Sequence, residues 1–166
     1  MKRLWVCLSI LLAAAILVTA CDLGEPSTRA DLQRVRIFFK YGFRDQVDTF
    51  NGTLTKDLVL NGTVTVPFGF KQCEQDSLLA ALVTAGFFAL PDTLYPLPNV
   101  SISPDPGYQV LRIEFEATTK SLVWMEVLDE SDPRTGRVRE LWARLRNLVQ
   151  STDTYKQLPA AVGGYL

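Results

Sequence analysis

Acidic side chains are the residues best suited to chemistry in this 166-residue chain, because it contains no histidine. Paired carboxylates can exchange protons with a substrate or bind Ca²⁺. Glu114 and Glu116 lie two residues apart in a stretch that alternates as a strand, so both should project from one face of a sheet. Apolar residues alternate with them, a pattern more typical of a solvated sheet face than of an active site.

Asp57 occupies the most unusual position among the candidate acids. A two-residue turn at Asn61-Gly62 would pair Asp57 with Val66 and place it on an apolar face of the sheet. A carboxyl group in such surroundings has a raised pKa and can act in a pocket. A position near the sheet edge, or a register that differs by one residue, would instead make Asp57 an ordinary solvated acid.

Missing residue types exclude several classes of chemistry. Without histidine there is no Ser-His-Asp or Cys-His nucleophile and no HExxH metal site. The nucleotide-binding patterns GxGxxG and GxxxxGKS/T are also absent from the sequence. We therefore predict no metal and no cofactor, and we favour a protein that is not an enzyme.

The start of the chain has the three parts of an export signal: a basic start, an apolar run over residues 4–20 and a small-residue end. Val18-Thr19-Ala20-Cys21 resembles the lipobox of bacterial lipoproteins, in which an aliphatic residue and two small residues precede a cysteine. The resemblance implies that Cys21 receives a diacylglycerol and that the chain is cut just before it.

Three alternatives remain for this segment. An apolar run of 17 residues could form an uncleaved membrane helix, since a span needs about 17–25 residues. It could also be an ordinary signal with a chance cysteine nearby, or a buried core helix. The lipoprotein interpretation predicts a protein held at the cell membrane or envelope by lipid on Cys21 and facing outside the cytoplasm.

Composition divides the chain into a signal peptide over residues 1–20, a flexible tether over 21–30 and a single globular domain over 31–166. Loss of the basic start leaves acids in excess, which gives no indication of nucleic-acid binding. Once the signal is removed and Cys21 is lipidated, Cys73 would be the one remaining cysteine. We therefore expect no disulfide in the domain and stability from packing alone.

Residues 32–68 have the pattern of an antiparallel meander. Apolar side chains alternate along its first ten residues, as in a half-buried strand. Asn51-Gly52 and Asn61-Gly62 follow, and Asn-Gly favours a hairpin because both central residues of a type I′ turn need a positive φ. The second pair has the better strand sequences on both sides.

Two helices are predicted after this meander. The first should end at Gly86. The second should begin at Pro133, with Asp132 as its cap, and it has an apolar stripe up to Val149. Its arginines could contact acidic lipid headgroups or an acidic partner, although a solvated helix face is the simpler interpretation. The apolar residues at helical spacing in the first helix are Leu78, Leu79, Leu82 and Val83.

Between the helices lie a proline-rich loop over residues 91–107 and a hairpin of two strands, over residues 108–117 and 121–127. A loop of this length in a small domain is often functional or mobile. The complete set of elements predicts an α+β fold. We expect a two-layer sandwich, an antiparallel sheet with two helices packed on one face, after the N-terminal signal helix.

The mature region resembles small uncharacterised bacterial lipoproteins in two segments. Those proteins carry Thr-Phe-Asn-Gly-Thr-x-Thr-Lys-Asp, here residues 49–57, before a helix that ends in Phe-Phe-x-x-Pro, here residues 87–91. The resemblance implies no activity. It agrees with the order of elements predicted above.

Three functions are compatible with these features. The favoured one is a non-catalytic envelope module that binds a protein or glycan partner. The second is a carboxylate-dependent hydrolase, which needs two acids that converge in one pocket. The third is a small-ligand sensor with the proline-rich loop as a lid, which predicts an apolar cavity beneath residues 91–107. The candidate acids are Asp57, Asp105, Glu114 and Glu116.

Overall fold

The computed structural model describes residues 35–95, 107–125 and 127–165, all of which belong to the unit Leu32–Leu166. Several predictions lie outside the described residues: the signal peptide with its lipobox and Cys21, the tether, and the loop segment that contains Asp105. No helix among the described residues combines the length and the apolar character that crossing a membrane requires.

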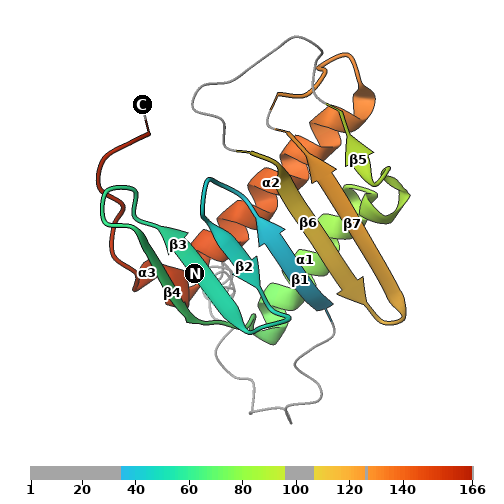
Figure 1. Ribbon diagram of the computed structural model, residues 1–166. Helices are drawn as coiled ribbons and strands as arrows, with labels where there is room; N and C mark the ends of the chain where they lie inside the picture. The colour runs from blue at the N-terminus through green and yellow to red at the C-terminus, as the bar shows by residue number, and fades with distance from the viewer. Residues whose placement is uncertain (1–34, 96–106, 126, 166) are drawn as a thin grey trace, which may run out of the picture. The chain divides into compact units, whose positions relative to one another are not determined.

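Seven strands of the described chain form one sheet, in the order β4-β3-β2-β1-β6-β7-β5 (Figure 1). All neighbouring pairs except β5–β7 are antiparallel. The strands are β1 (Val35–Lys40), β2 (Gln46–Asp48), β3 (Thr53–Asp57), β4 (Thr63–Pro67), β5 (Thr93–Leu94), β6 (Gln109–Phe115) and β7 (Thr118–Trp124).

Strand β1 follows the predicted alternation. Val35, Ile37 and Phe39 are buried, and the residues between them are half-buried on the other face. Ile37 lies opposite Ile113 of β6 in the register of this pair. A slip of one residue would turn all three buried side chains to the other face, so burial fixes the register.

The β3–β4 hairpin forms where the second Asn-Gly pair predicts it, but its connection is longer. Residues 58–62 join the strands, and Asp57 lies opposite Thr63. Val66 lies opposite Leu54 instead. The predicted pairing of Asp57 with Val66 is therefore wrong, because it assumed a two-residue turn.

Backbone conformation explains the longer connection. Val59 has φ 60° and Gly62 has φ 74°, whereas the predicted type I′ turn needed positive φ at Asn61 and Gly62. A β-branched residue with positive φ is uncommon and costly, so its surroundings must hold it. Val59 forms a parallel bridge with Val162 near the end of the chain, which supplies that support.

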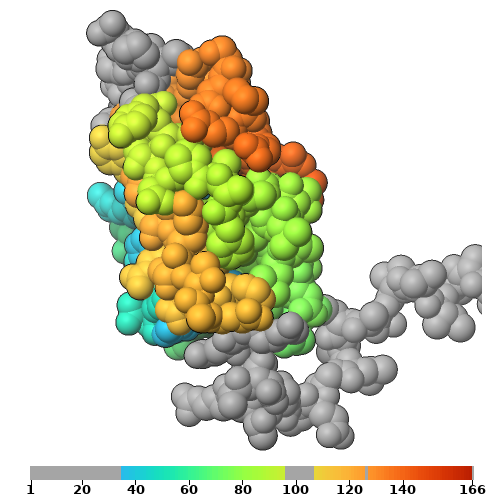
Figure 2. Space-filling model, turned by 90° about the vertical axis from the view of Figure 1, so that its right-hand side faces the viewer, coloured from blue at the N-terminus to red at the C-terminus, as the bar shows by residue number. Residues whose placement is uncertain are grey.

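Strand β5 makes the sheet mixed rather than antiparallel. Thr93 pairs with Val123 and Leu94 with Trp124 in parallel register, and the Val123 amide donates to the Asp92 carbonyl at 2.9 Å. Figure 2 looks onto this edge and shows α1 and the segment that follows it beside β7. The antiparallel prediction failed here because a strand of two residues shows no alternation.

Helix α1 (Gln72–Thr84) ends before Gly86, which has φ 61° and supplies the left-handed conformation common after helix ends. A short 3₁₀ helix, η1 (Phe87–Ala89), follows. Val83 was expected on the apolar stripe, but it is 73% exposed. The stripe is shifted round the helix, and its buried members are Gln75, Leu78, Ala81 and Leu82.

Helix α2 (Pro133–Ser151) begins as predicted. The Asp132 carboxylate accepts a hydrogen bond from the Arg134 amide at 2.8 Å, and Pro133 occupies the first turn, where its missing N–H costs nothing. A short helix, α3 (Asp153–Lys156), follows. The predicted apolar stripe is confirmed: Val138, Leu141, Leu145 and Val149 are buried.

One apolar core joins the sheet to the helices. Buried residues of β1, β6 and β7 cluster with those of α1 and α2. Figure 1 shows both helices on the same side of the sheet. The α+β class is confirmed.

Two predictions about single residues need comment. Cys73 in α1 is disulfide-bonded in the full-length chain. The expectation of no disulfide concerns the processed domain, without the signal and with lipid on Cys21, and it stays a prediction. Glu116 has φ 54° and lies in the turn between β6 and β7, not on the strand face of Glu114. The strand ends at Phe115, one residue too early to carry both glutamates.

Candidate functional site

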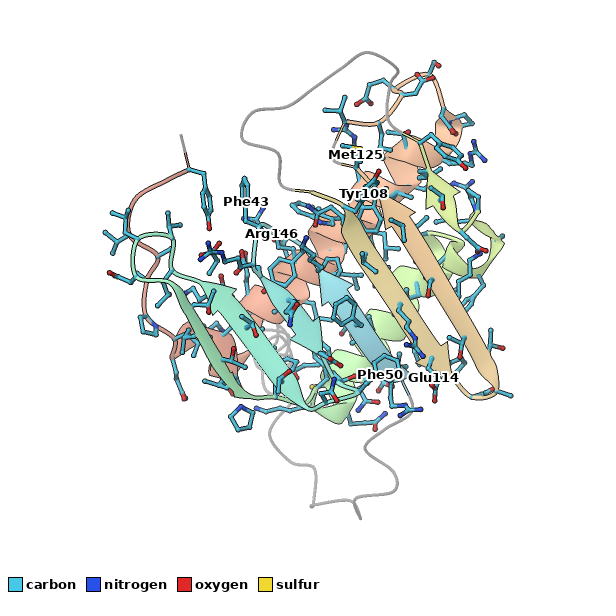
Figure 3. All side chains as sticks on the ribbon, in the orientation of Figure 1. Phe43, Phe50, Tyr108, Glu114, Met125 and Arg146 are labelled. Carbon is cyan, nitrogen blue, oxygen red and sulfur yellow. The ribbon has the colours of Figure 1, made fainter. Side chains whose placement is uncertain are left out.

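A cavity of about 390 Å³ opens at the end of the sheet where β1 and β3 stop and β6 starts. We call it the sheet-end pocket. Phe43 and Arg146 lie at this end of the sheet in Figure 3, and Glu114 lies at the opposite end. The polar lining of the sheet-end pocket comprises Asp45, Lys56, Asp57, Gln109, Arg146 and Gln150. Its aromatic lining comprises Tyr41, Phe43, Trp142, Tyr155 and Tyr165.

The tight loop between β1 and β2 positions Tyr41 and Asp45. The Tyr41 amide donates to the Asp45 carbonyl at 3.1 Å, which closes the loop. The Tyr41 ring stacks on Phe39, with centroids 4.9 Å apart, and is thereby fixed to the core. A Cβ at position 42 would lie 2.7 Å from Asp45 Oδ2, so glycine here leaves room for the Asp45 carboxylate in its observed position.

Two carboxylates meet at the inner end of the pocket. The Asp57 amide donates to Asp45 Oδ1 at 2.9 Å. Asp57 is buried, with 6% exposure; its Oδ1 accepts from the Val59 amide at 2.9 Å and its Oδ2 accepts from the Tyr165 hydroxyl. Both oxygens of Asp57 are therefore engaged, whereas Asp45 Oδ2 accepts no hydrogen bond from any described residue.

Burial sets the protonation of two groups in the pocket. Burial raises the pKa of Asp45, and the Asp57 charge adds to that effect, while the hydrogen bond from the Asp57 amide and the charges of Arg146 and Lys56 oppose it. Burial likewise raises the pKa of Tyr41, so its phenol stays neutral and can both donate and accept.

Two cations face the same space. Lys56 is 8% exposed, and its Nζ lies 4.5 Å from the centroid of the Tyr155 ring. Arg146 is exposed at the pocket mouth, with its Cζ 5.2 Å from the Trp142 ring centroid. Among the described residues, neither cation has a carboxylate within ion-pair distance. A lysine with so little exposure and no carboxylate within ion-pair distance is uncommon, because buried charges are normally paired.

Three polar atoms in the pocket walls are buried and have no hydrogen-bond partner among the described residues. They are Tyr41 Oη, Gln109 Oε1 and Trp142 Nε1. Tyr41 and Gln109 are each 3% exposed. Almost all buried polar groups in folded proteins are satisfied, so three exceptions among the lining residues of one pocket are unusual.

A second cavity of about 210 Å³ adjoins the first and shares Gln109 and Trp142 with it. Trp124 and Leu128 supply its apolar wall, and Arg139 lies at its edge. Gln109 and Trp142 thus lie between the two cavities. Both cavities border β6 just after the proline-rich loop, of which residues 96–106 lie outside the described residues.

The C-terminal segment closes one side of the sheet-end pocket. The Leu60 amide donates to the Val162 carbonyl at 3.2 Å, and the Val162 amide donates to the Leu58 carbonyl at 3.3 Å. This pairing brings Tyr165 over the pocket, where its ring stacks on Phe43 with centroids 4.0 Å apart. The hydrogen bond to Asp57 is the main cause of the raised pKa of Tyr165.

Of the acids proposed from the sequence, Asp57 alone is placed in the pocket by the described structure. Glu114 forms an ion pair with Arg36 on the sheet surface, and Glu116 lies in an exposed turn. Asp105 and the lipidation residue Cys21 lie outside the described residues. The described residues contain no cluster of three or more side chains able to hold a metal ion.

Most residues of the sheet-end pocket were not predicted from the sequence as site residues. Asp45 and Tyr41 lie in a short loop, and Gln109 occupies the first position of a strand; none of these positions breaks a sequence pattern. Arg146 was assigned to a solvated helix face. Comparison with known proteins gives no match, either to a protein-family model or to a curated sequence.

Proposed function

We propose that the chain is a lipid-anchored, non-catalytic binding module of the bacterial cell envelope whose ligand is a small polar molecule held in the sheet-end pocket. In this proposal a two-layer α+β domain follows a cleaved signal helix, and lipid on Cys21 holds the domain at the membrane. Two acyl chains anchor a protein stably, whereas one does so only marginally.

The unpartnered atoms of Tyr41, Gln109 and Trp142 carry the proposal. Each buried polar group without a partner costs about 1–3 kcal/mol of folding free energy. In the ligand-free domain these three atoms lie behind the pocket surface, and a rotation of their side chains would turn them toward a ligand in the cavity. The cavity volume of about 390 Å³ falls within the usual range for small-molecule sites.

The hydrolase hypothesis has weaker support. It needs two carboxyl groups free to exchange protons with a substrate. Both oxygens of Asp57 accept hydrogen bonds from Val59 and Tyr165, which fits a positioning residue better than an acid or base. Asp45 is then the one acid with an oxygen open to the pocket. We therefore favour binding without turnover.

Replacement of Gln109 by leucine tests the proposed function. Leucine has no polar atom to leave unpartnered, so Gln109→Leu should stabilise the ligand-free protein and weaken ligand binding. The measurement is thermal unfolding of the detergent-solubilised full-length protein, alone and with panels of amino acids, sugars and carboxylic acids. A bound ligand raises the unfolding temperature by mass action.

Gln157→Leu is the matched control, because Gln157 is exposed and does not line the pocket. It should leave both stability and ligand response as in the unmodified protein. If Gln109→Leu destabilises the protein and no panel member shifts its unfolding temperature, Gln109 has a structural role and the proposed binding function is wrong.

A further inference from the structure

We propose that the ligand is an amino-acid-sized zwitterion, an α-amino acid or dipeptide with an apolar or aromatic side chain. Its carboxylate would bind Lys56 and Arg146, and its ammonium group would bind Asp45. This inference rests on the proposed function and adds the chemical class of the ligand.

The sheet-end pocket is lined by charges of both signs. Two carboxylates, Asp45 and Asp57, face two cations, Lys56 and Arg146, so the described residues of the lining carry no net excess of charge. The two carboxylates would repel a simple anion, and the two cations would repel a simple cation. A neutral sugar would leave the buried Lys56 ammonium without a counterion. A zwitterion compensates both signs.

The charges in the pocket are also spaced apart. Asp45, Lys56 and Arg146 all line the sheet-end pocket, so the three groups border a common space. Among the described residues, neither Lys56 nor Arg146 lies within the 4.0 Å of an ion pair from Asp45 or Asp57. The gap can admit ligand atoms that carry the complementary charges.

Uncharged residues complete the lining of the sheet-end pocket. Rotation of their side chains would present Tyr41 Oη and Trp142 Nε1 as donors to a carboxylate and Gln109 Oε1 as an acceptor to an ammonium group. The rings of Phe43, Tyr155 and Tyr165 form aromatic walls that suit an apolar side chain. The adjoining cavity beyond Trp142 gives room for a second residue.

The experiment uses three probes that differ by one charge each: L-phenylalanine, N-acetyl-L-phenylalanine without the ammonium charge, and L-phenylalanine amide without the carboxylate. Calorimetric titration of the full-length protein in detergent should give binding of phenylalanine, and each derivative should bind at least roughly tenfold more weakly. A panel of the common amino acids and of dipeptides run in parallel covers side chains other than phenylalanine.

Variants then assign each charge to a residue. Asp45→Asn should weaken phenylalanine and its amide but leave the N-acetyl derivative unchanged. Lys56→Met and Arg146→Gln should weaken phenylalanine and the N-acetyl derivative but leave the amide unchanged. Arg144→Gln is the matched control, because Arg144 lies on the same helix and pairs with Glu140 outside the pocket.

The possible results distinguish the zwitterion proposal from the proposed binding function. Amino-acid binding with this crossed pattern supports the inference. Binding of a neutral sugar such as N-acetylglucosamine, blocked by Gln109→Leu, with no binding of any amino acid or dipeptide, would overturn the zwitterion and leave the binding function standing. Absence of binding by every probe would overturn both. Losses that are equal for all three phenylalanine probes would show that the variants perturb the fold and not a charge contact, and would also count against the inference.

Discussion

At the residue scale, the pocket depends on a carboxylate that is costly to keep charged. Asp45 is held by one amide hydrogen bond and lies beside a second acid, and burial raises its pKa. Charged groups kept in unfavourable surroundings are frequent at functional sites, where a ligand supplies the missing compensation. Asp57 differs, because three groups fix its position: its own amide, the Val59 amide and the Tyr165 hydroxyl.

The raised pKa of Asp45 predicts the pH dependence of stability. The folded state binds this proton more tightly than the unfolded chain, so the contribution of Asp45 to stability falls as pH rises from the ordinary aspartate range through the raised pKa. Asp45→Asn keeps the acceptor for the Asp57 amide and removes the charge. We expect it to be more stable than the unmodified protein at neutral pH, with the difference shrinking in acid.

Urea unfolding of both proteins across this pH range checks the expectation. Asp92→Asn is the control, because Asp92 is exposed and ion-paired with Lys120, and its substitution should bring no gain at neutral pH. An Asp45→Asn protein that is less stable than the unmodified one at neutral pH would contradict the account of a destabilising buried charge.

At the element scale, the C-terminal segment and the β3–β4 connection depend on each other. Val59 is held with positive φ, its bridge to Val162 orders the end of the chain, and that end carries Tyr165 to the pocket. The cost of the Val59 conformation is offset by backbone hydrogen bonds on both sides of the bridge. An irregular connection of this kind can place a side chain where a tight two-residue turn would not.

Two adjacent glycines allow this dependence to be tested. Gly163 has φ 90°, and a Cβ there would lie 2.9 Å from Leu60 side-chain atoms, whereas a Cβ on Gly164 would meet nothing within 4 Å. Gly163→Ala should displace the C-terminal segment, weaken ligand binding and lower the unfolding temperature slightly. Gly164→Ala should change neither. The measurements are thermal unfolding and ligand titration, and equal behaviour of the two variants would show that the segment does not shape the pocket.

At the scale of the whole molecule, the proposed anchor determines where the pocket acts. Lipid on Cys21 would hold the domain at the membrane surface, and the residues between Cys21 and β1 would set its reach. The pocket would then sample small molecules outside the cytoplasm. Nothing in this arrangement requires a histidine, a metal or a nucleotide.

Metabolic labelling with a clickable fatty acid in a bacterial expression host tests the proposed anchor. Cys21→Ala should abolish the label and leave either an unprocessed precursor or a released form, and Cys73→Ser, which leaves the lipobox intact, should keep the label. Membrane attachment of Cys21→Ala that is as complete as that of the unmodified protein, with no fatty acid on the unmodified protein, would indicate an uncleaved helix instead.

Elements with a local cause could be predicted from the sequence. They are the α2 stripe, its Asp132 cap, the positions of the two hairpins near the Asn-Gly pairs and the α+β class, because periodicity and capping act over a few residues. The type I′ turn expected at Asn61-Gly62 did not form, since the positive φ angles lie at Val59 and Gly62. The exclusions due to the absence of histidine are equally independent of the fold. Strand β5 was not predicted, because a strand of two residues shows no alternation. The register of Asp57 was predicted wrongly, because a positive φ at Val59 is not expected for a β-branched residue.

Which side chains share the pocket depends on the packing of segments that are distant in the sequence. Tyr41, Asp45, Gln109, Trp142 and Tyr165 come from a loop, a strand start, a helix and the chain end, and no local pattern links them. They meet because packing of α2 against the sheet and pairing of the chain end with the β3–β4 connection bring distant segments to one edge. Burial, and with it the raised pKa of Asp45 and the unpartnered atoms, exists only after that packing, because each depends on the exclusion of water by residues remote in sequence.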